Sequence, residues 1–139
     1  FDLLKRDHSL RNAAIEETLR LEPSLRMTVR SVCQDVEFHG VSIPAGNSVA
    51  LWLMAANRDP DVFDNPDQFD LTNKRPRHLS FAAGPHFCLG APLARMEADV
   101  AAHTLIQRVQ HIELLSPPQM SDNGNLNNIL SLEARFEGY

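Results

Sequence analysis

The 139-residue sequence has few cysteines, no long apolar run and no excess of positive charge. Its two cysteines, Cys33 and Cys88, are too few for a disulfide framework, which favours a reducing setting and hence a cytoplasmic location. No apolar run approaches the roughly eighteen residues of a membrane helix, so no membrane span is expected. The net charge of −5 argues against a general nucleic-acid binder.

The sequence also starts without a methionine, and residues 1–7 show no secretory signal. We therefore expect the natural N-terminus to lie upstream and the chain to be part of a longer protein. Residues are 43% hydrophobic and 22% charged, which is typical of a globular protein. No internal repeat or low-complexity segment divides the chain, so residues 1–139 are expected to belong to one domain.

The hydrophobic patterning predicts a mainly α-helical chain with small β-sheets. One long helix is expected over about 10–21, capped by Asp7 or Ser9 and ending before Pro23. A second is expected over about 89–109, with an Arg95–Asp99 pair at i,i+4 spacing on its outer side. The shorter expected elements are a helix end over 1–5, strands over 29–38, 41–43 and 48–53, a helical turn over 55–59, and C-terminal strands within 111–137, near 111–115 and 130–136.

Residues 60–79 follow neither the helical nor the strand period. Asp, Asn and Pro recur along this segment, with Phe63 and Phe69 as isolated apolar residues. Long loops without periodicity are uncommon in compact domains and are often functional.

Glu17 lies in the middle of an apolar stripe of the first long helix, with Arg20 one turn later on the same side. A buried carboxylate is costly unless it is paired and hydrogen-bonded, so the two residues are expected to pair. The same spacing is common in ordinary surface ion pairs, so the pattern alone does not indicate a functional site.

Cys88 lies between a glycine-punctuated loop and the second long helix, in the pattern Phe81, Gly84, His86, Cys88, Gly90. A helix N-terminus favours a thiolate, which is the form that binds metals. The glycines allow sharp turns and a close approach of the backbone to a flat ligand. A free cysteine by itself is more often a small buried core residue.

The chain resembles bacterial-type cytochrome P450s in three motifs that follow one another in order. They are Glu-Thr-Leu-Arg at 17–20, Ala-Asn-Arg-Asp-Pro at 56–60 and the pattern at 81–90. The resemblance extends over essentially the whole chain and implies the C-terminal, haem-binding portion of the P450 fold. It places the family's K helix at about 10–21, strands at about 29–53, the meander at 60–79, the haem loop at 80–90 and the L helix at about 89–109.

The resemblance implies an enzyme, a haem-thiolate monooxygenase that activates O₂ and inserts one oxygen atom into a small apolar substrate. Its cofactor would be haem b, and its electrons would come from a donor of the ferredoxin and ferredoxin reductase type. The basic cluster at 74–78 is a candidate docking site for an acidic ferredoxin. Residues near 25–29 and 127–130 match segments that reach the substrate in the family.

The resemblance also implies roles for residues of the cysteine pattern. Cys88 would be the axial ligand of the iron, and Phe81 would shield its sulfur. Gly84 and Gly90 would shape the loop. The candidates for contacts with the haem propionates, which are anionic, are His86, Arg30 and His78.

In the family, the glutamate and arginine of the K helix bind an arginine of the meander, which here implies Glu17, Arg20 and Arg75. The usual arginine position falls on Asn73, so either Arg75 takes the role or the triad is incomplete. The alternative for the cluster at 74–77 is a solvated basic patch.

Two features differ from the family. Ala82 occupies a position that is usually glycine; it is strained if the backbone there needs a positive φ and harmless otherwise. The acid–alcohol pair that delivers protons to oxygen in the family has no counterpart in these residues, so the chain alone is expected to be inactive. The alternative function is a non-catalytic, truncated haem-binding P450-like module.

Overall fold

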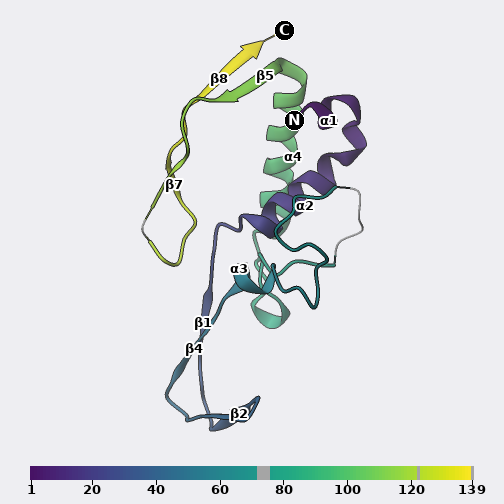
Figure 1. The fold of residues 1–139 in the computed structure, drawn as a ribbon. Helices are drawn as coiled ribbons and strands as arrows, with labels where there is room; N and C mark the ends of the chain where they lie inside the picture. The colour runs from purple at the N-terminus through teal and green to yellow at the C-terminus, as the bar shows by residue number, and fades with distance from the viewer. Residues whose placement is uncertain (72–75, 122, 139) are drawn as a thin grey trace.

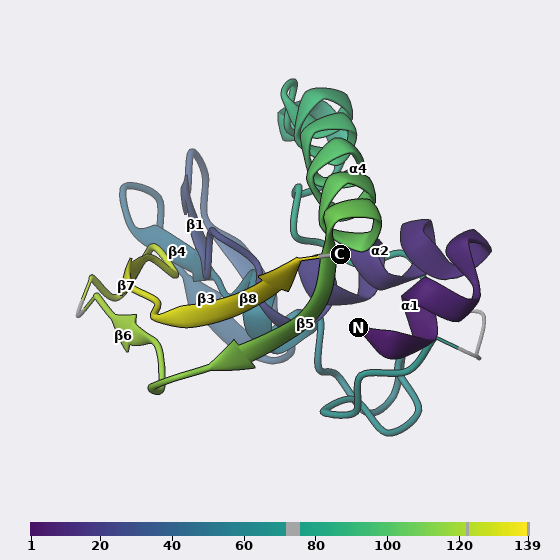
Figure 2. The same ribbon diagram turned by 90° about the horizontal axis from the view of Figure 1, so that it is seen from above.

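The structure is a computed structural model that describes residues 1–71, 76–121 and 123–138. The two longer helices, α2 and α4, pack against each other, and α1 lies beside them near the N-terminus (Figures 1 and 2). No helix among the described residues has the length and apolar character needed to cross a bilayer. The helical elements are α1 (Asp2–Arg6), the 3₁₀ turn η1 (His8–Leu10), α2 (Arg11–Leu21), α3 (Leu53–Ala56), the 3₁₀ turn η2 (Gly84–His86) and α4 (Ala91–Arg108).

Local sequence signals account for the limits of the two longer helices. Asp7 caps η1 by accepting a hydrogen bond from the backbone N–H of Ser9 at 2.9 Å, and α2 follows without a break. Helix α2 ends at Leu21, because Glu22 precedes Pro23 and leaves the helical conformation. Helix α4 tolerates Pro92 because it lies in the first turn, where its missing N–H would have no intrahelical partner.

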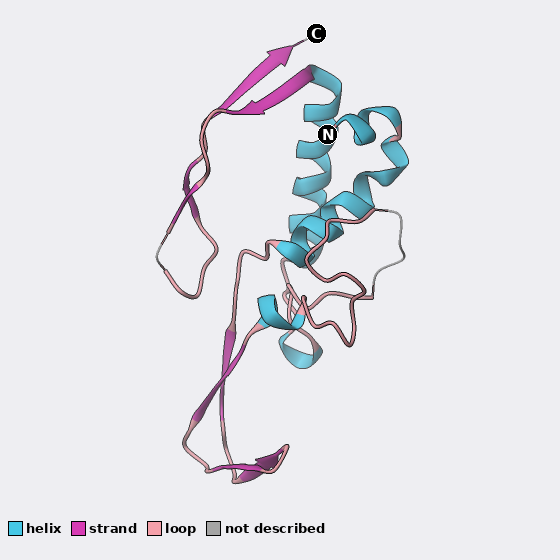
Figure 3. Cartoon of the chain, in the orientation of Figure 1, coloured by secondary structure: helices cyan, strands magenta, loops and turns pink. Residues whose placement is uncertain are grey.

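The described strands form four separate two-stranded antiparallel ladders. The β1–β4 ribbon projects away from the helices and ends in the β2–β3 hairpin, while β5–β8 joins the end of α4 to the C-terminus (Figures 1 and 3). The strands are β1 (Thr28–Ser31), β2 (Val36–Phe38), β3 (Val41–Ile43), β4 (Ser48–Leu51), β5 (Val109–Leu114), β6 (Gln119–Met120), β7 (Ile129–Ser131) and β8 (Ala134–Gly138).

The single strands expected over 29–38 and 130–136 are wrong, because each run is divided between two ladders. After β1 the chain changes partner, and Asp35 accepts a hydrogen bond from the backbone N–H of Ala45 at 2.8 Å across the gap before β2. The later run divides between β7, which pairs with β6, and β8, which pairs with β5. The helical turn expected over 55–59 lies earlier, at α3.

The core is small and lies where α2, α3, the 60–71 segment and α4 meet. Along the exposed side of α4, Leu93, Met96 and Val100 are each more than half exposed, so this helix presents an uncovered apolar row. The buried apolar side chains are Ala14, Leu21, Leu53, Phe63, Ala91, Ile106 and Val109.

Candidate functional site

The segment Phe81–Gly90, called the cysteine loop below, is folded back on itself by backbone hydrogen bonds. The N–H of Cys88 donates to the carbonyl of Phe81 at 2.9 Å, and the N–H of Phe87 donates to Gly84 at 3.0 Å. A Cβ built on Gly90 would lie 3.8 Å from the Cys88 Sγ, so the sulfur lies beside the first turn of α4. The Cys88 residue itself is exposed. The loop therefore presents a free thiol at the N-terminal end of a helix.

Two residues of the cysteine loop have a left-handed backbone. Gly84 has φ +67°, which glycine adopts without a steric penalty. Ala82 has φ +58°, and its N–H donates to the carbonyl of Leu79 at 2.8 Å. The backbone at Ala82 therefore has the positive φ that strains a residue other than glycine. The cost is about 1–2 kcal/mol relative to the right-handed region.

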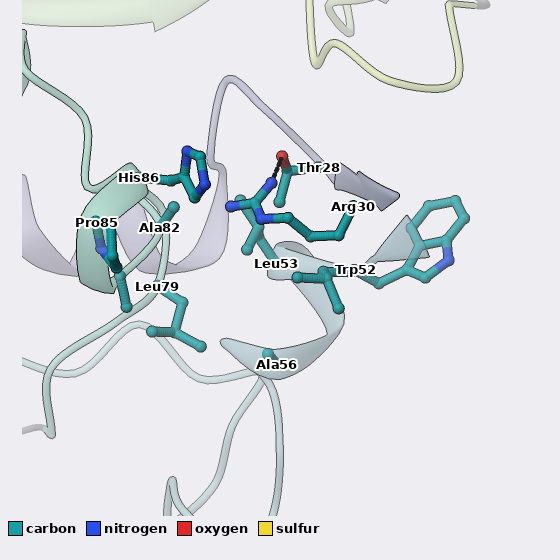
Figure 4. Close-up of a pocket in the computed structure, with 11 residues that line it drawn as sticks. Thr28, Arg30, Trp52, Leu53, Ala56, Leu79, Ala82, Pro85 and His86 are labelled. Carbon is teal, nitrogen blue, oxygen red and sulfur yellow. Dashed lines mark hydrogen bonds between the residues drawn. The ribbon is translucent and has the colours of Figure 1, made fainter. Parts of the chain in front are cut away.

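Cys88 lines a pocket of about 430 Å³ together with Arg30, Phe81 and His86. A neighbouring pocket of about 480 Å³ has Arg30 and His86 on its lining as well, and its other walls are mainly apolar (Figure 4). The structure thus brings a thiol, a guanidinium and an imidazole, from segments far apart in the sequence, to one apolar depression.

The β1 strand positions Arg30 toward the cysteine loop. Its NH1 donates to the Thr28 hydroxyl and to the Val29 carbonyl, both at 2.9 Å, and its guanidinium points toward His86 in Figure 4. Among the described residues, no carboxylate lies within ion-pair distance of Arg30. Its charge is available to an anionic group in the pocket.

Glu17 and Arg20 pair as the apolar stripe predicts, at 2.8 Å for each of two contacts, and both side chains are buried. The Arg20 guanidinium also donates to the backbone carbonyls of Asn57, Pro66 and Gln68. The pair therefore anchors the segment at 60–71 to α2. Arg75 and Asn73, the two candidates for the third member of the triad, lie outside the described residues.

Asn57 is a buried connector that sequence reasoning missed. Its Nδ2 donates to the carbonyl of Arg20 at 3.0 Å and to the Ser80 hydroxyl at 2.8 Å, and its Oδ1 accepts from the backbone N–H of Leu79 at 2.7 Å. The side chain thereby joins the end of α2 to the residues just before the cysteine loop. Its place in the Ala-Asn-Arg-Asp-Pro run was the available signal.

His78 does not line either pocket described above. The side chain is buried, with its Nε2 3.1 Å from the Glu16 carboxylate and its Nδ1 accepting from the backbone N–H of Ser80 at 3.2 Å. Burial lowers the pKa of His78, and the nearby Glu16 carboxylate opposes this shift. Both ring nitrogens are engaged within the protein, so the structure does not bring His78 to Cys88, Arg30 and His86.

The Arg95–Asp99 pair expected along α4 is wrong. Arg95 instead donates to both oxygens of Glu16 on α2, at 2.6 and 2.9 Å, and this hydrogen bonding lowers the pKa of Glu16. Asp99 pairs with Arg11 of α2. Both ion pairs join α2 to α4. Arg95 and Asp99 therefore pair with residues of the neighbouring helix and not with each other along α4.

The sequence model of the family described as Cytochrome P450 matches residues 8–137. The chain belongs to the cytochrome P450 family. It is 47% identical over 111 residues to a biotin biosynthesis cytochrome P450 of Bacillus subtilis, which covers 80% of this chain and 28% of that protein.

Solved P450 structures share the fold. The structure of P450BioI with an acyl carrier protein ligated to hexadec-9Z-enoic acid has a TM-score of 0.93 and 41% identity, covering 97% of this chain and 35% of that one. CYP109Q5 from Chondromyces apiculatus has a TM-score of 0.94 and 35% identity, covering 99% and 36%. The chain thus has the helices and small sheets of the C-terminal part of the P450 fold, and it spans about a third of the length of these relatives.

Membership of the P450 family implies a haem cofactor, and the residues at the site suit one. A thiolate is a soft, anionic ligand for iron, and Cys88 lines an open apolar pocket. Arg30 and His86, at the same pocket, are hydrogen-bond donors of the kind that anionic propionates need.

Proposed function

We propose that this chain forms the thiolate-bearing wall of the haem b site in a monooxygenase that inserts one atom of O₂ into an apolar organic substrate. The observation that supports it most is the placement of Cys88. Its exposed thiol, at the N-terminal end of α4, shares a pocket with Arg30 and His86. A structural cysteine would be expected inside the core, away from such a pocket.

Within this proposal, each residue of the pocket has a distinct role. Cys88, just before the N-terminal end of α4, would bind the haem iron through its sulfur. Phe81 would shield the sulfur, and Gly84 and Gly90 would let the loop approach the cofactor closely. Haem bound through a thiolate supplies the activation of O₂, because electron donation from sulfur favours cleavage of the O–O bond.

Arg30 and His86 would hold the propionates. Arg30 is prepared for this role, because its hydrogen bonds to Thr28 and Val29 fix the guanidinium before any ligand arrives. The structure gives His78 a different set of partners, so we do not retain it as a propionate contact.

Glu17 and Arg20 would act on the same site indirectly, by holding the meander under the cysteine loop. Arg75 as the third member of this triad remains a prediction.

A ferredoxin-type donor in the cytoplasm would supply the electrons. Of the basic cluster proposed to dock it, Arg77 is exposed, whereas His78 is buried and is not available at the surface. Lys74 and Arg75 of this cluster lie outside the described residues, so Arg77 is the charge of the described part that is available for docking.

The test uses the full-length protein that contains this chain, purified with haem, reduced and treated with carbon monoxide. The wild type and Cys33→Ser should show the red-shifted Soret band of thiolate ligation, and Cys88→Ser should lose it. Cys33 is the matched control, because it is also a free, exposed cysteine. A wild-type protein without the band, or a Cys88→Ser protein that keeps it, refutes the proposal.

A further inference from the structure

Helix α2 carries two successive glutamates that serve different contacts. Glu17 pairs with Arg20 on its own helix. Glu16 instead accepts two hydrogen bonds from Arg95 of α4 and a third contact from His78 at 3.1 Å. The two-point contact fixes the guanidinium plane of Arg95, as a single contact would not.

The guanidinium that Glu16 holds lies over the ring of Phe81. The Arg95 Cζ is 4.6 Å from the ring centroid, and the ring of His78 is 6.1 Å from the same centroid. A cation at this distance is attracted to the face of an aromatic ring. Phe81 is therefore held by a charged group on α4 and by a buried imidazole.

Phe81 connects this cluster to the ligand cysteine in two ways. Its ring lines the pocket that contains Cys88, and its backbone carbonyl accepts the hydrogen bond from the Cys88 N–H at 2.9 Å. A shift of the Phe81 backbone would alter this hydrogen bond to Cys88.

We propose that Arg95 is a positioning residue which, held by Glu16, fixes Phe81 beside Cys88 and raises the reduction potential of an iron bound by Cys88. This inference rests on the proposed haem-thiolate function. Reduction by one electron would make a haem site held by Cys88 more negative by one unit of charge. A positive charge near the site favours the reduced state, and solvent screens part of this effect because the Arg95 and Glu16 side chains are 35% and 42% exposed.

The experiment is a potentiometric titration of the full-length haem protein with dithionite, in which each ferric iron accepts one electron. Arg95→Met removes the charge and keeps an apolar stem, and Arg95→Gln removes it but can still donate a hydrogen bond to Glu16. Either variant should shift the reduction equilibrium toward the ferric state by about tenfold, which is about 59 mV for one electron. Arg95→Lys, which keeps the charge, should recover at least half of the shift.

Arg11→Met is the matched control. Arg11 pairs with Asp99 between the same two helices, but it has no contact with Phe81 among the interactions of the described residues. Its loss should weaken the helix contact and leave the potential unchanged. The inference would be overturned if Arg95→Met and Arg95→Gln had the same reduction potential as Arg11→Met.

The remaining outcomes separate the two proposals. A wild type without the thiolate-type carbon monoxide band would refute the proposed function and this inference with it. An intact band with an unaltered potential in the neutral variants refutes the inference alone. If both neutral variants fail to bind haem while Arg95→Lys binds it, the charge of Arg95 is needed only for folding. That outcome would also overturn the proposed effect on the reduction potential.

Discussion

Glu17 and Arg20 form a two-point ion pair inside the protein, with Oε2 to Nε and Oε1 to NH2 each at 2.8 Å and side-chain exposures of 3% and 1%. The guanidinium also lies 5.1 Å from the centroid of the buried Phe63 ring. A buried cation with this many fixed contacts depends on its carboxylate partner, because the protein interior solvates a charge poorly.

Glu17→Ala should therefore destabilise the full-length protein by about 3–5 kcal/mol and lower its haem content. Urea unfolding and the ratio of haem to protein measure the two effects. Glu113→Ala is the control, because its 2.9 Å pair with Arg135 is exposed and should contribute no more than about 1 kcal/mol. Normal haem content in Glu17→Ala would contradict the anchoring role.

Asn57→Ala should leave hydrogen-bonding groups without a partner on both sides of the connector. The Leu79 N–H and the Arg20 carbonyl would each lose a hydrogen bond, at about 1–3 kcal/mol for each unsatisfied group. We expect a loss of about 3 kcal/mol in the free energy of unfolding. Asn12→Ala, at an exposed position of α2, should change it by less than about 0.5 kcal/mol. Equal midpoints for the two variants would show that Asn57 is not a structural connector.

Ala82→Gly should stabilise the protein, because glycine adopts the left-handed backbone that Ala82 holds at φ +58°. The relief of strain exceeds the added entropy of the unfolded chain, which leaves a gain of about 0.5–1 kcal/mol. Ala83→Gly tests the reverse case. Ala83 has φ −150°, so glycine there should cost about 0.5–1 kcal/mol. A loss of stability in Ala82→Gly would contradict the strain assigned to this residue.

His78 should make the protein sensitive to mild acid. Burial lowers its pKa below the ordinary value of 6.5, so the folded state disfavours the protonated ring. Its contribution to stability is present above the unfolded pKa and is lost as the pH falls below about 6.5 toward the lowered folded pKa.

The free energy of unfolding should decrease less in His78→Gln than in the wild type as the pH is lowered from about 7.5 to 5.5. Urea unfolding at a series of pH values measures this difference. The exposed His111 gives a control, because His111→Gln should leave the slope of the wild type unaltered. A His78→Gln protein with the same slope as the wild type would show that another group governs acid sensitivity.

The sequence predicts the parts of the fold that depend on local signals. Pro23 lies just after α2 and Pro92 lies in the first turn of α4, so the C-terminal limit of α2 and the N-terminal limit of α4 follow from steric rules that act over one turn. The pairing of Glu17 with Arg20 follows from a carboxylate in an apolar stripe. The pattern at 81–90 similarly indicates a loop that leads into a helix.

Contacts between distant segments do not follow from such rules. The partner of Arg95 is 79 residues away in the sequence, and only the packing of α2 on α4 brings Glu16 to it. Asn57 lies just after a four-residue helix, and its Ala-Asn-Arg-Asp-Pro run marks the position without specifying the partners that its buried side chain binds. The division of the run at 29–38 between two ladders likewise depends on which strands come together, and periodicity does not specify a partner.

The central claim is that Cys88 binds the haem iron through its sulfur. Iron K-edge X-ray absorption on the full-length haem protein tests it most directly, because the spectrum reports the atoms bound to iron. We predict a sulfur neighbour of the iron in the wild type and in Cys33→Ser, and its loss in Cys88→Ser. An iron–sulfur contact that persists in Cys88→Ser, or that is missing from the wild type, would contradict the claim.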